Sequence, residues 1–273
     1  MNINFNNRLI LVKKIVKDNP YENQKKTIEK LFSKTKHKDF DDIKLRLFVI
    51  DSCYSTQMNK RLFAFEALSD LILNLEEKSD LNTSIDVLSF VKKNQDLFKE
   101  KIGIDKKGSP KGHAFSLISK YFYYRTHFNF PIYDSLVFNE LRLENQIKSP
   151  KKPSILYFEK LLEWKENFGI TYDDLDMYFW VCGKVRSGSL SLLISNPKDY
   201  KNEFYDKLKL NENDWYDNDE SYDNHEHPKK KKPFNSIVSD KLLSKDIKFD
   251  YPKLKDIQKL AKTIFKEKVF DKC

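Results

Sequence analysis

Apolar residues recur along most of the chain at intervals of three and four, the spacing that places them on one face of an α-helix. The pattern is clearest in residues 39–54, where Asp41 and Asp42 stand at the start, as the helix dipole favours. The same spacing predicts helices over residues 21–36, 39–54, 59–77, 84–102, 154–168, 172–184 and 253–270. We therefore expect an all-α, mostly helical fold.

The stretch from residue 108 to 141 combines a turn, an apolar helix and a proline break. A Gly-Ser-Pro-Lys-Gly turn containing Lys111 comes first, and apolar residues at helical spacing follow over residues 112–125. Pro131 disfavours helix in the residue before it. Asp134 then stands where a helix N-cap belongs, because its carboxylate accepts the N–H groups of the first turn. The pattern predicts two consecutive helices whose starts carry Lys111 and Asp134.

This arrangement resembles the helix-hairpin-helix DNA glycosylase superfamily, in which a turn ending in Lys precedes an apolar helix and an Asp-bearing entry into the next one. The matching positions here are Lys111, residues 112–125 and residues 131–137. A second match lies upstream, where a helix runs into Ser-Thr-Gln57 and a polar turn follows. The resemblance covers about residues 40–145. The superfamily's glycine-rich hairpin turn is replaced here by residues 102–110.

The resemblance implies a two-lobed, glycosylase-like architecture with a divergent hairpin, and a DNA-binding protein that acts as a DNA glycosylase or abasic-site lyase. In that chemistry the target base is flipped out of the stack, a carboxylate stabilises positive charge on the sugar, and a lysine amine attacks C1′. By position, Asp134 is the carboxylate and Lys111 the amine. Lys120 is either the alternative catalytic lysine or the partner of Asp134 in a structural ion pair. The implied nucleic-acid contacts are Gln57, Asn59, Lys60, Lys106, Lys107, Ser109 and Tyr133.

Two other interpretations stay open. A non-catalytic DNA-binding or defence-associated protein would keep the fold and use Asp134 only as an N-cap. A helical interaction protein of unrelated fold would turn Asp134 toward solvent, far from Gln57. The enzyme hypothesis instead predicts a cleft that brings together Asp134, a lysine amine and Gln57, with basic residues at its rim.

Composition supports a polyanionic partner. The net charge is +9 and the sequence pI is about 9.1, a balance that favours association with polyanions such as DNA, RNA or acidic membranes. Lysine is abundant throughout the chain, so the composition of the coding DNA is an alternative cause of this charge. The three cysteines lie far apart with no Cys-x-x-Cys pair, so we expect no disulfide framework, no metal, no cofactor and a cytoplasmic location. The apolar run at residues 9–16 is too short for a signal peptide or a membrane span.

The chain is predicted to divide into a helical core at residues 1–210, a low-complexity linker at 211–233 and a C-terminal helical segment at 234–273. The linker is acidic in its first half and basic in its second. Asp174 and Asp176 in the helix at 172–184 are two residues apart and do not share a helix face, so we expect no metal site there.

Overall fold

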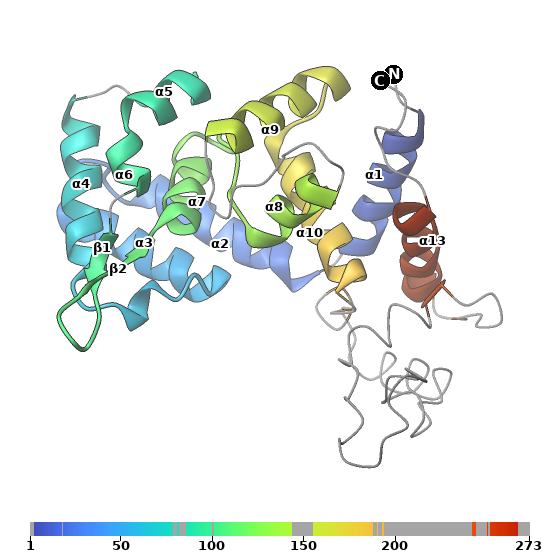
Figure 1. The fold of residues 1–273 in the computed structure, drawn as a ribbon, viewed down its shortest axis with the longest axis horizontal. Helices are drawn as coiled ribbons and strands as arrows, with labels where there is room; N and C mark the ends of the chain where they lie inside the picture. Colours follow the sequence, from blue (N-terminus) through green and yellow to red (C-terminus); the bar gives the residue numbers. More distant parts are fainter. Residues whose placement is uncertain are drawn as a thin grey trace, which may run out of the picture. The chain divides into compact units, whose positions relative to one another are not determined.

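The computed structural model describes residues 3–17, 19–78, 81, 86–99, 101–143, 155–187, 190, 193, 242–243, 250 and 252–266. Within these ranges the secondary structure is helical except for one two-stranded sheet (Figure 1). The predicted mostly helical fold is confirmed. The predicted linker at 211–233 and the predicted domain boundary at residue 210 lie outside the described residues.

The chain forms two compact units, Pro20–Asp176 and a second made of Asn2–Asn19 with Met177–Cys273. In the second unit, α1 (Ile3–Val16) packs against α13 (Pro252–Lys266) through buried apolar side chains. Arg8 on α1 donates a hydrogen bond to the Thr263 carbonyl at 3.2 Å. The first unit carries all the residues singled out from the sequence as a site.

Helix α7 (Phe115–Arg125) is the central helix of the first unit, because every residue from 117 to 125 is buried. Helices α2 (Pro20–Lys34), α3 (Phe40–Tyr54) and α6 (Gln95–Lys99) pack against it. Aromatic rings fill the space around it; Phe122, for example, packs against Phe90 at 4.8 Å between centroids. The remaining helices of this unit are α4 (Ala64–Lys78), α5 (Val87–Lys93), α8 (Ser135–Leu143), α9 (Ile155–Phe168) and the first part of α10 (Tyr172–Arg186).

The predicted helix at 39–54 is confirmed as α3, and Asp39 caps it by accepting from the Asp42 N–H at 3.0 Å. The predicted helix at 59–77 begins later than expected. A 3-10 turn, η1 (Met58–Lys60), comes first, and α4 starts at Ala64. Phe63, which precedes α4, is 65% exposed and has a φ of 58°. The cause is backbone pairing of Leu62 with Ile104, which holds this segment out of the helix.

The single helix predicted at 84–102 is divided at Asn94 into two short helices, and the prediction is wrong after Lys99. Asp86 caps the short helix α5, α6 follows, and the chain then enters an antiparallel hairpin of β1 (Lys101–Ile104) and β2 (Pro110–His113). The helix predicted from residue 112 therefore begins only at Phe115. Gly108 and Gly112 have φ values of 77° and 85°, which favour a turn and a twisted strand over a helix.

Gly112 also makes room for a neighbouring side chain. A Cβ at Gly112 would stand 2.2 Å from Nε of Arg61, and a Cβ at Gly103 would stand 2.7 Å from Cβ of the same arginine. The Arg61 side chain thus lies flat across both strands of the hairpin. This contact joins the segment after α3 to the β1–β2 hairpin.

Candidate functional site

The turn between α7 and α8 places Asp134 beside Lys120. Residues 126–134 fold back along α7, and the Tyr133 N–H donates to Ser119 Oγ at 2.8 Å. The Leu136 N–H then donates to Asp134 Oδ1 at 2.7 Å, which confirms the predicted capping of α8 by this aspartate. The second carboxylate oxygen, Oδ2, lies 3.9 Å from the Lys120 amine.

The Lys120 amine is buried and held by polar neighbours. Its Nζ donates to Ser116 Oγ at 2.7 Å and to the Tyr133 carbonyl at 3.1 Å. The ring of Tyr54, at the end of α3, lies beneath it at 5.1 Å between Nζ and the ring centroid. Only 2% of the Lys120 side chain is exposed, against 31% for Asp134, so the pair opens to solvent on the carboxylate side.

Burial lowers the pKa of the Lys120 amine, because a charged ammonium is poorly solvated inside the protein. The carboxylates of Asp134 and Asp176 act in the opposite direction and favour the ammonium. A lysine with a depressed pKa supplies neutral amine more readily than one in solvent, and this is how enzymes activate a lysine as a nucleophile. The cluster therefore has the chemistry for attack on an electrophilic carbon.

Lys111 does not stand at a helix start, and this sequence prediction is wrong. It is exposed on β2, paired across the hairpin with Gly103. The error follows from treating residues 110–113 as the first turn of the helix, whereas the strand pairing removes them from it. Of the two candidate lysines, Lys120 is the one that forms an ion pair with Asp134.

Gln57, Asn59 and Lys60 lie on the exposed turn after α3. Gln57 has a φ of 62°, and the buried Asp51 carboxylate holds the turn by accepting from the Met58 N–H at 2.9 Å and the Asn59 N–H at 3.2 Å. Gln57 follows the helix end that carries Tyr54, the ring beneath Lys120. Only Ser55 and Thr56 separate Gln57 from Tyr54 along the chain.

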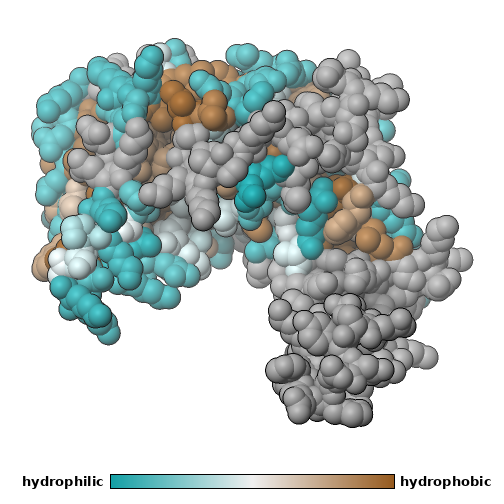
Figure 2. Space-filling view, in the orientation of Figure 1, coloured by the Kyte–Doolittle hydropathy of each residue, from teal (hydrophilic) through white to brown (hydrophobic). Residues whose placement is uncertain are grey.

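Lys106, Lys107 and Ser109 form the exposed turn of the β1–β2 hairpin. The Asp105 carboxylate accepts from the Lys107 N–H at 2.9 Å and the Ser109 N–H at 3.0 Å, which shapes the turn and leaves the lysine side chains outside. The hairpin turn projects at the lower left of Figure 1, and this projection is strongly hydrophilic in Figure 2. Lysines at such a projection suit contacts to phosphates.

The Tyr133 ring packs against other aromatic side chains. Its ring lies against Phe115 at 5.0 Å and against Tyr157 at 5.1 Å between centroids, and the residue is only partly exposed. Burial, and next the neighbouring Asp134 carboxylate, raise the pKa of its phenol. Its carbonyl, rather than its ring, contacts Lys120.

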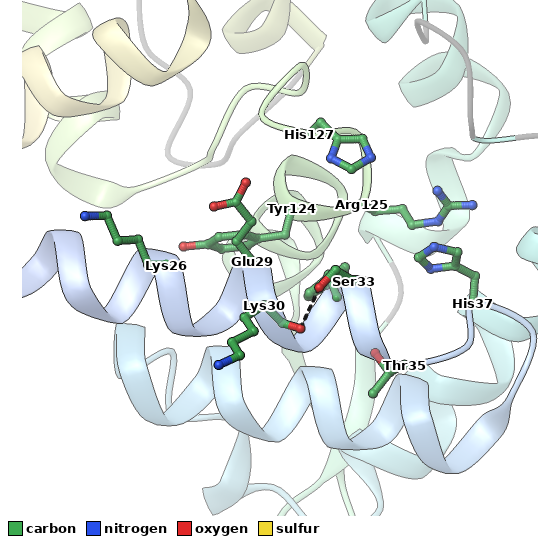
Figure 3. Close-up of a pocket in the computed structure, with 10 residues that line it drawn as sticks. Lys26, Glu29, Lys30, Ser33, Thr35, His37, Tyr124, Arg125 and His127 are labelled. Atoms are coloured by element: carbon green, nitrogen blue, oxygen red, sulfur yellow. Dashed lines mark hydrogen bonds between the residues drawn. The ribbon is translucent and has the colours of Figure 1, made fainter.

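A cavity of about 420 Å³ lies between α2 and the turn after α7 (Figure 3). Lys26 and Glu29 stand at one end, and His37, Arg125 and His127 stand at the other. Burial, together with the positive charge of Arg125, Arg46 and His127, lowers the pKa of His37 to about 4. The Arg46 guanidinium donates to His37 Nδ1 at 2.8 Å, so the neutral ring carries its proton on Nε2.

Sequence reasoning missed a second carboxylate near Lys120. Asp176 on α10 was set aside as an unpaired neighbour of Asp174, but it accepts a hydrogen bond from the Tyr21 hydroxyl at 3.3 Å. Tyr21 in turn lies 3.0 Å from the Tyr54 hydroxyl. No helical spacing signals a contact between α2, α3 and α10, because it depends on tertiary packing. In the described part of the chain, no group of three or more His, Cys, Asp or Glu residues could hold a metal ion.

Comparisons with protein families, with curated proteins and with solved structures gave no match to this chain.

Proposed function

We propose that the chain binds DNA and cleaves the N-glycosidic bond of a flipped base, with Lys120 as the nucleophile and Asp134 as the charge-stabilising carboxylate. The observation that carries the proposal is the ion pair itself, a buried amine of depressed pKa beside a partly exposed carboxylate. Amines of this kind are found where an enzyme forms a covalent adduct with its substrate.

The chemistry follows from the arrangement. The neutral Lys120 amine attacks C1′ of the deoxyribose while the base leaves with the electrons of the glycosidic bond. Asp134 lies within 3.9 Å of the amine and stabilises the positive charge that develops on the sugar and then on the nitrogen. Loss of a proton from the nitrogen and opening of the sugar ring give a Schiff base, which permits strand cleavage by elimination.

The basic turns supply the expected DNA contacts. Lys60 follows Gln57 on the turn after α3, and Lys106 and Lys107 lie in the turn between β1 and β2. Backbone bonds between Leu62 and Ile104 join these two turns. Phosphate contacts from such lysines would orient a duplex without reading its sequence.

The test is borohydride trapping on oligonucleotides that carry an abasic site or one of a panel of damaged bases. Wild-type protein is expected to form a covalent adduct, Lys120→Gln to form none, and Asp134→Asn to form it about 100-fold more slowly. Lys111→Gln is the matched control: it removes an exposed lysine nine residues earlier (120 minus 111) and should retain the adduct at saturating DNA.

A trapped adduct that survives in Lys120→Gln would contradict the assignment of the nucleophile. If wild type forms no adduct but releases base in an Asp134-dependent reaction, the covalent step is absent and water is the nucleophile. If neither reaction occurs while DNA is bound, the chain is the non-catalytic DNA-binding protein of the second interpretation, and Asp134 is a helix cap. Circular dichroism of each variant establishes that it is folded.

A further inference from the structure

The Arg46 guanidinium on α3 is a buried charge that forms no ion pair in the described part of the chain. It is 0% exposed. Its N–H groups donate to neutral acceptors, which are Thr35 Oγ1 at 2.7 Å, the Thr35 carbonyl at 2.6 Å, the Phe32 carbonyl at 3.4 Å, the Tyr121 hydroxyl at 3.3 Å and His37 Nδ1 at 2.8 Å. Burial of a charge is costly unless an opposite charge lies near it, so these surroundings favour an anion.

Arg46 lies directly behind the wall of the cavity between α2 and the turn after α7. Three of the residues that it contacts, Phe32, Thr35 and His37, line that cavity. Its guanidinium also lies 4.6 Å from the centroid of the Phe32 ring. The buried positive charge is therefore separated from the cavity by a single layer of side chains, and an anion in the cavity would lie close to it.

Two histidines line the end of the cavity that is nearest to this charge (Figure 3). Because Arg46 can only donate, His37 accepts through Nδ1 and carries its proton on Nε2. Among the described residues, the His37 side chain makes no other hydrogen bond, so this N–H is available to a ligand. Burial, and next the neighbouring positive charges, lower the pKa of His37 to about 4, so the ring is a neutral donor at pH 7. His127 is exposed on the turn after α7.

The other charged side chains around the cavity also favour an anion. Lys26 and Lys30 on α2 line it, and Glu29 is the one carboxylate among the described lining residues. None of these three forms an ion pair in the described part of the chain. Their charges therefore leave the cavity with an excess of positive charge, to which Arg46 adds.

Phosphate suits the histidine end better than a carboxylate does. Proteins recognise carboxylates with the two-pronged guanidinium of an arginine, but that of Arg125 is already bound to Glu76. The remaining donors are single N–H groups on separate segments, the loop after α2 and the turn after α7. A phosphate group presents three acceptor oxygens in different directions and can meet donors that approach from different sides.

The rest of the cavity has room for an organic group. Its volume of about 420 Å³ lies in the range of small-molecule sites, about 300–1,000 Å³. The rings of Phe32 and Tyr124, 5.7 Å apart between centroids, line it. Glu29 stands at the end away from the histidines, where its carboxylate can accept from hydroxyl groups (Figure 3). These features fit a phosphorylated sugar.

We propose that this cavity binds a phosphate monoester of a sugar, with its phosphate group at the end formed by His37, Arg125 and His127. The His37 Nε2–H donates to a phosphate oxygen, and Arg46, bound to Nδ1 of the same ring, supplies the charge behind it. Lys120 does not line the cavity, and this inference is independent of the proposed bond cleavage. A free sugar phosphate and the 5′-phosphorylated end of a DNA strand share this chemistry.

The test is a proton–nitrogen-15 NMR titration of the full chain that follows the imidazole nitrogens of His37 and His127. Ribose 5-phosphate should shift both rings saturably at millimolar concentration, and ribose should shift neither. Inorganic phosphate should bind about tenfold more weakly, because it leaves the aromatic wall uncovered. Oligonucleotides with and without a 5′-phosphate form the second arm. Saturable shifts with either phosphate source support the site, and the tighter ligand identifies the source.

His127→Asn should weaken binding of ribose 5-phosphate about tenfold. Asparagine tolerates the φ of 50° at this position, and its side chain is uncharged and shorter than that of histidine. His113→Asn is the matched control, since His113 is exposed on β2 and does not line the cavity, and it should leave the affinity unchanged. Arg46→Gln should also weaken binding at least tenfold. If that variant fails to fold, the exposed His127 still decides the question.

Several results would overturn the proposal. These are the absence of a saturable shift with both phosphate sources, equal binding of ribose and ribose 5-phosphate, and a His127→Asn variant that binds as tightly as wild type. Inorganic phosphate that binds as tightly as ribose 5-phosphate would overturn the assignment of a sugar ester. Lys120→Gln separates this inference from the proposed function, because it should lose the trapped adduct and bind ribose 5-phosphate as wild type does.

Discussion

Two ion pairs that contain a buried charge differ in their geometry. Arg125 and Glu76 form a complete pair, with two guanidinium–carboxylate hydrogen bonds of 2.7 and 2.9 Å and almost no exposure. Lys120 and Asp134 form a loose one, with 3.9 Å between the charged atoms and an open carboxylate edge. The first arrangement satisfies both partners and suits a structural role. The second leaves capacity for a third group to enter.

Replacing Glu76 is expected to destabilise the first unit. Glu76→Gln would leave the Arg125 guanidinium buried without its counter-charge, at a cost of about 3–5 kcal/mol in the free energy of unfolding. Urea unfolding followed by circular dichroism measures it. Glu163→Gln, which breaks the largely exposed pair with Lys160, is the control and should change stability by less than about 0.5 kcal/mol. Equal losses in the two variants would contradict the structural role of Glu76.

Asp176 should make stability fall as pH rises. Burial raises its pKa in the folded state from the ordinary value of 3.8 to about 7, so the folded chain binds the extra proton. This contribution is complete below pH 3.8 and is lost as pH rises to about 7. His37 acts with the opposite sign, since its pKa falls from 6.5 to about 4 and its contribution is lost as pH falls through that window.

The two effects are separated by variants. Asp176→Asn should remove the decline between pH 4 and 7, so that its urea midpoint rises with pH more steeply than that of wild type. His37→Asn should do the reverse. A difference between wild type and Asp176→Asn that is constant over this range would show that Asp176 has an ordinary pKa.

At the scale of elements, the β1–β2 hairpin determines where both basic turns lie. Its strand β2 leads directly into α7, and its strand β1 pairs with Leu62 after η1. The hairpin is short, and only the glycines at 108 and 112 supply the backbone conformations it needs. Arg61 fixes the segment after α3 to it by filling the space above Gly112.

Gly112→Ala is expected to disrupt this contact. The substitution would combine a φ of 85°, which disfavours a side chain by about 1–3 kcal/mol, with overlap on Arg61. Gly108→Ala has a φ of 77° but open space around it, so it isolates the backbone cost. Hydrogen exchange of the β1 and β2 amides measures both. The double change Gly112→Ala with Arg61→Ala should recover part of the loss, and additive losses would contradict the packing explanation.

The elements differ in how far the sequence could predict them. The helix capped by Asp39 and the Asp134 cap follow local rules, and both are present in the structure. The hairpin was missed because four-residue strands show no clear alternation and because its partner Leu62 lies 42 residues earlier (104 minus 62). That omission also misplaced Lys111 and extended the helix toward it.

The candidate site was predictable only in part for the same reason. Lys120 and Asp134 belong to one helical hairpin, so a sequence pattern could suggest that they meet. Asp176 and Tyr21 come from helices that are distant along the chain, and only packing around α7 brings them together. Residue spacing along a single helix carries no information about such contacts.

At the scale of the whole molecule, the net charge of +9 favours anionic partners. In the described residues, no helix is long and apolar enough to cross a membrane. Each of the two units has its own buried apolar residues, and each carries exposed lysines, including Lys106 and Lys107 on the first and Lys255 and Lys259 on the second. Net charge alone therefore does not say which unit binds a polyanion.

Salt dependence of DNA binding is expected to distinguish the units. The double change Lys106→Gln with Lys107→Gln should reduce the slope of log affinity against log salt by about 2, since each duplex phosphate contact contributes about 0.9. Fluorescence anisotropy at several salt concentrations measures the slope. Lys255→Gln with Lys259→Gln on α13 removes the same charge and should leave the slope nearly as it is. A larger change in that control would assign the contact to α13.

The backbone bonds between Leu62 and Ile104 have a mechanical consequence. They join the hairpin to the segment after α3, which begins at the helix end that carries Tyr54, the ring beneath the Lys120 amine. A phosphate bound at the hairpin would therefore also restrain the segment that leads to Tyr54. Movement of the hairpin would shift the Tyr54 ring relative to the Lys120 amine.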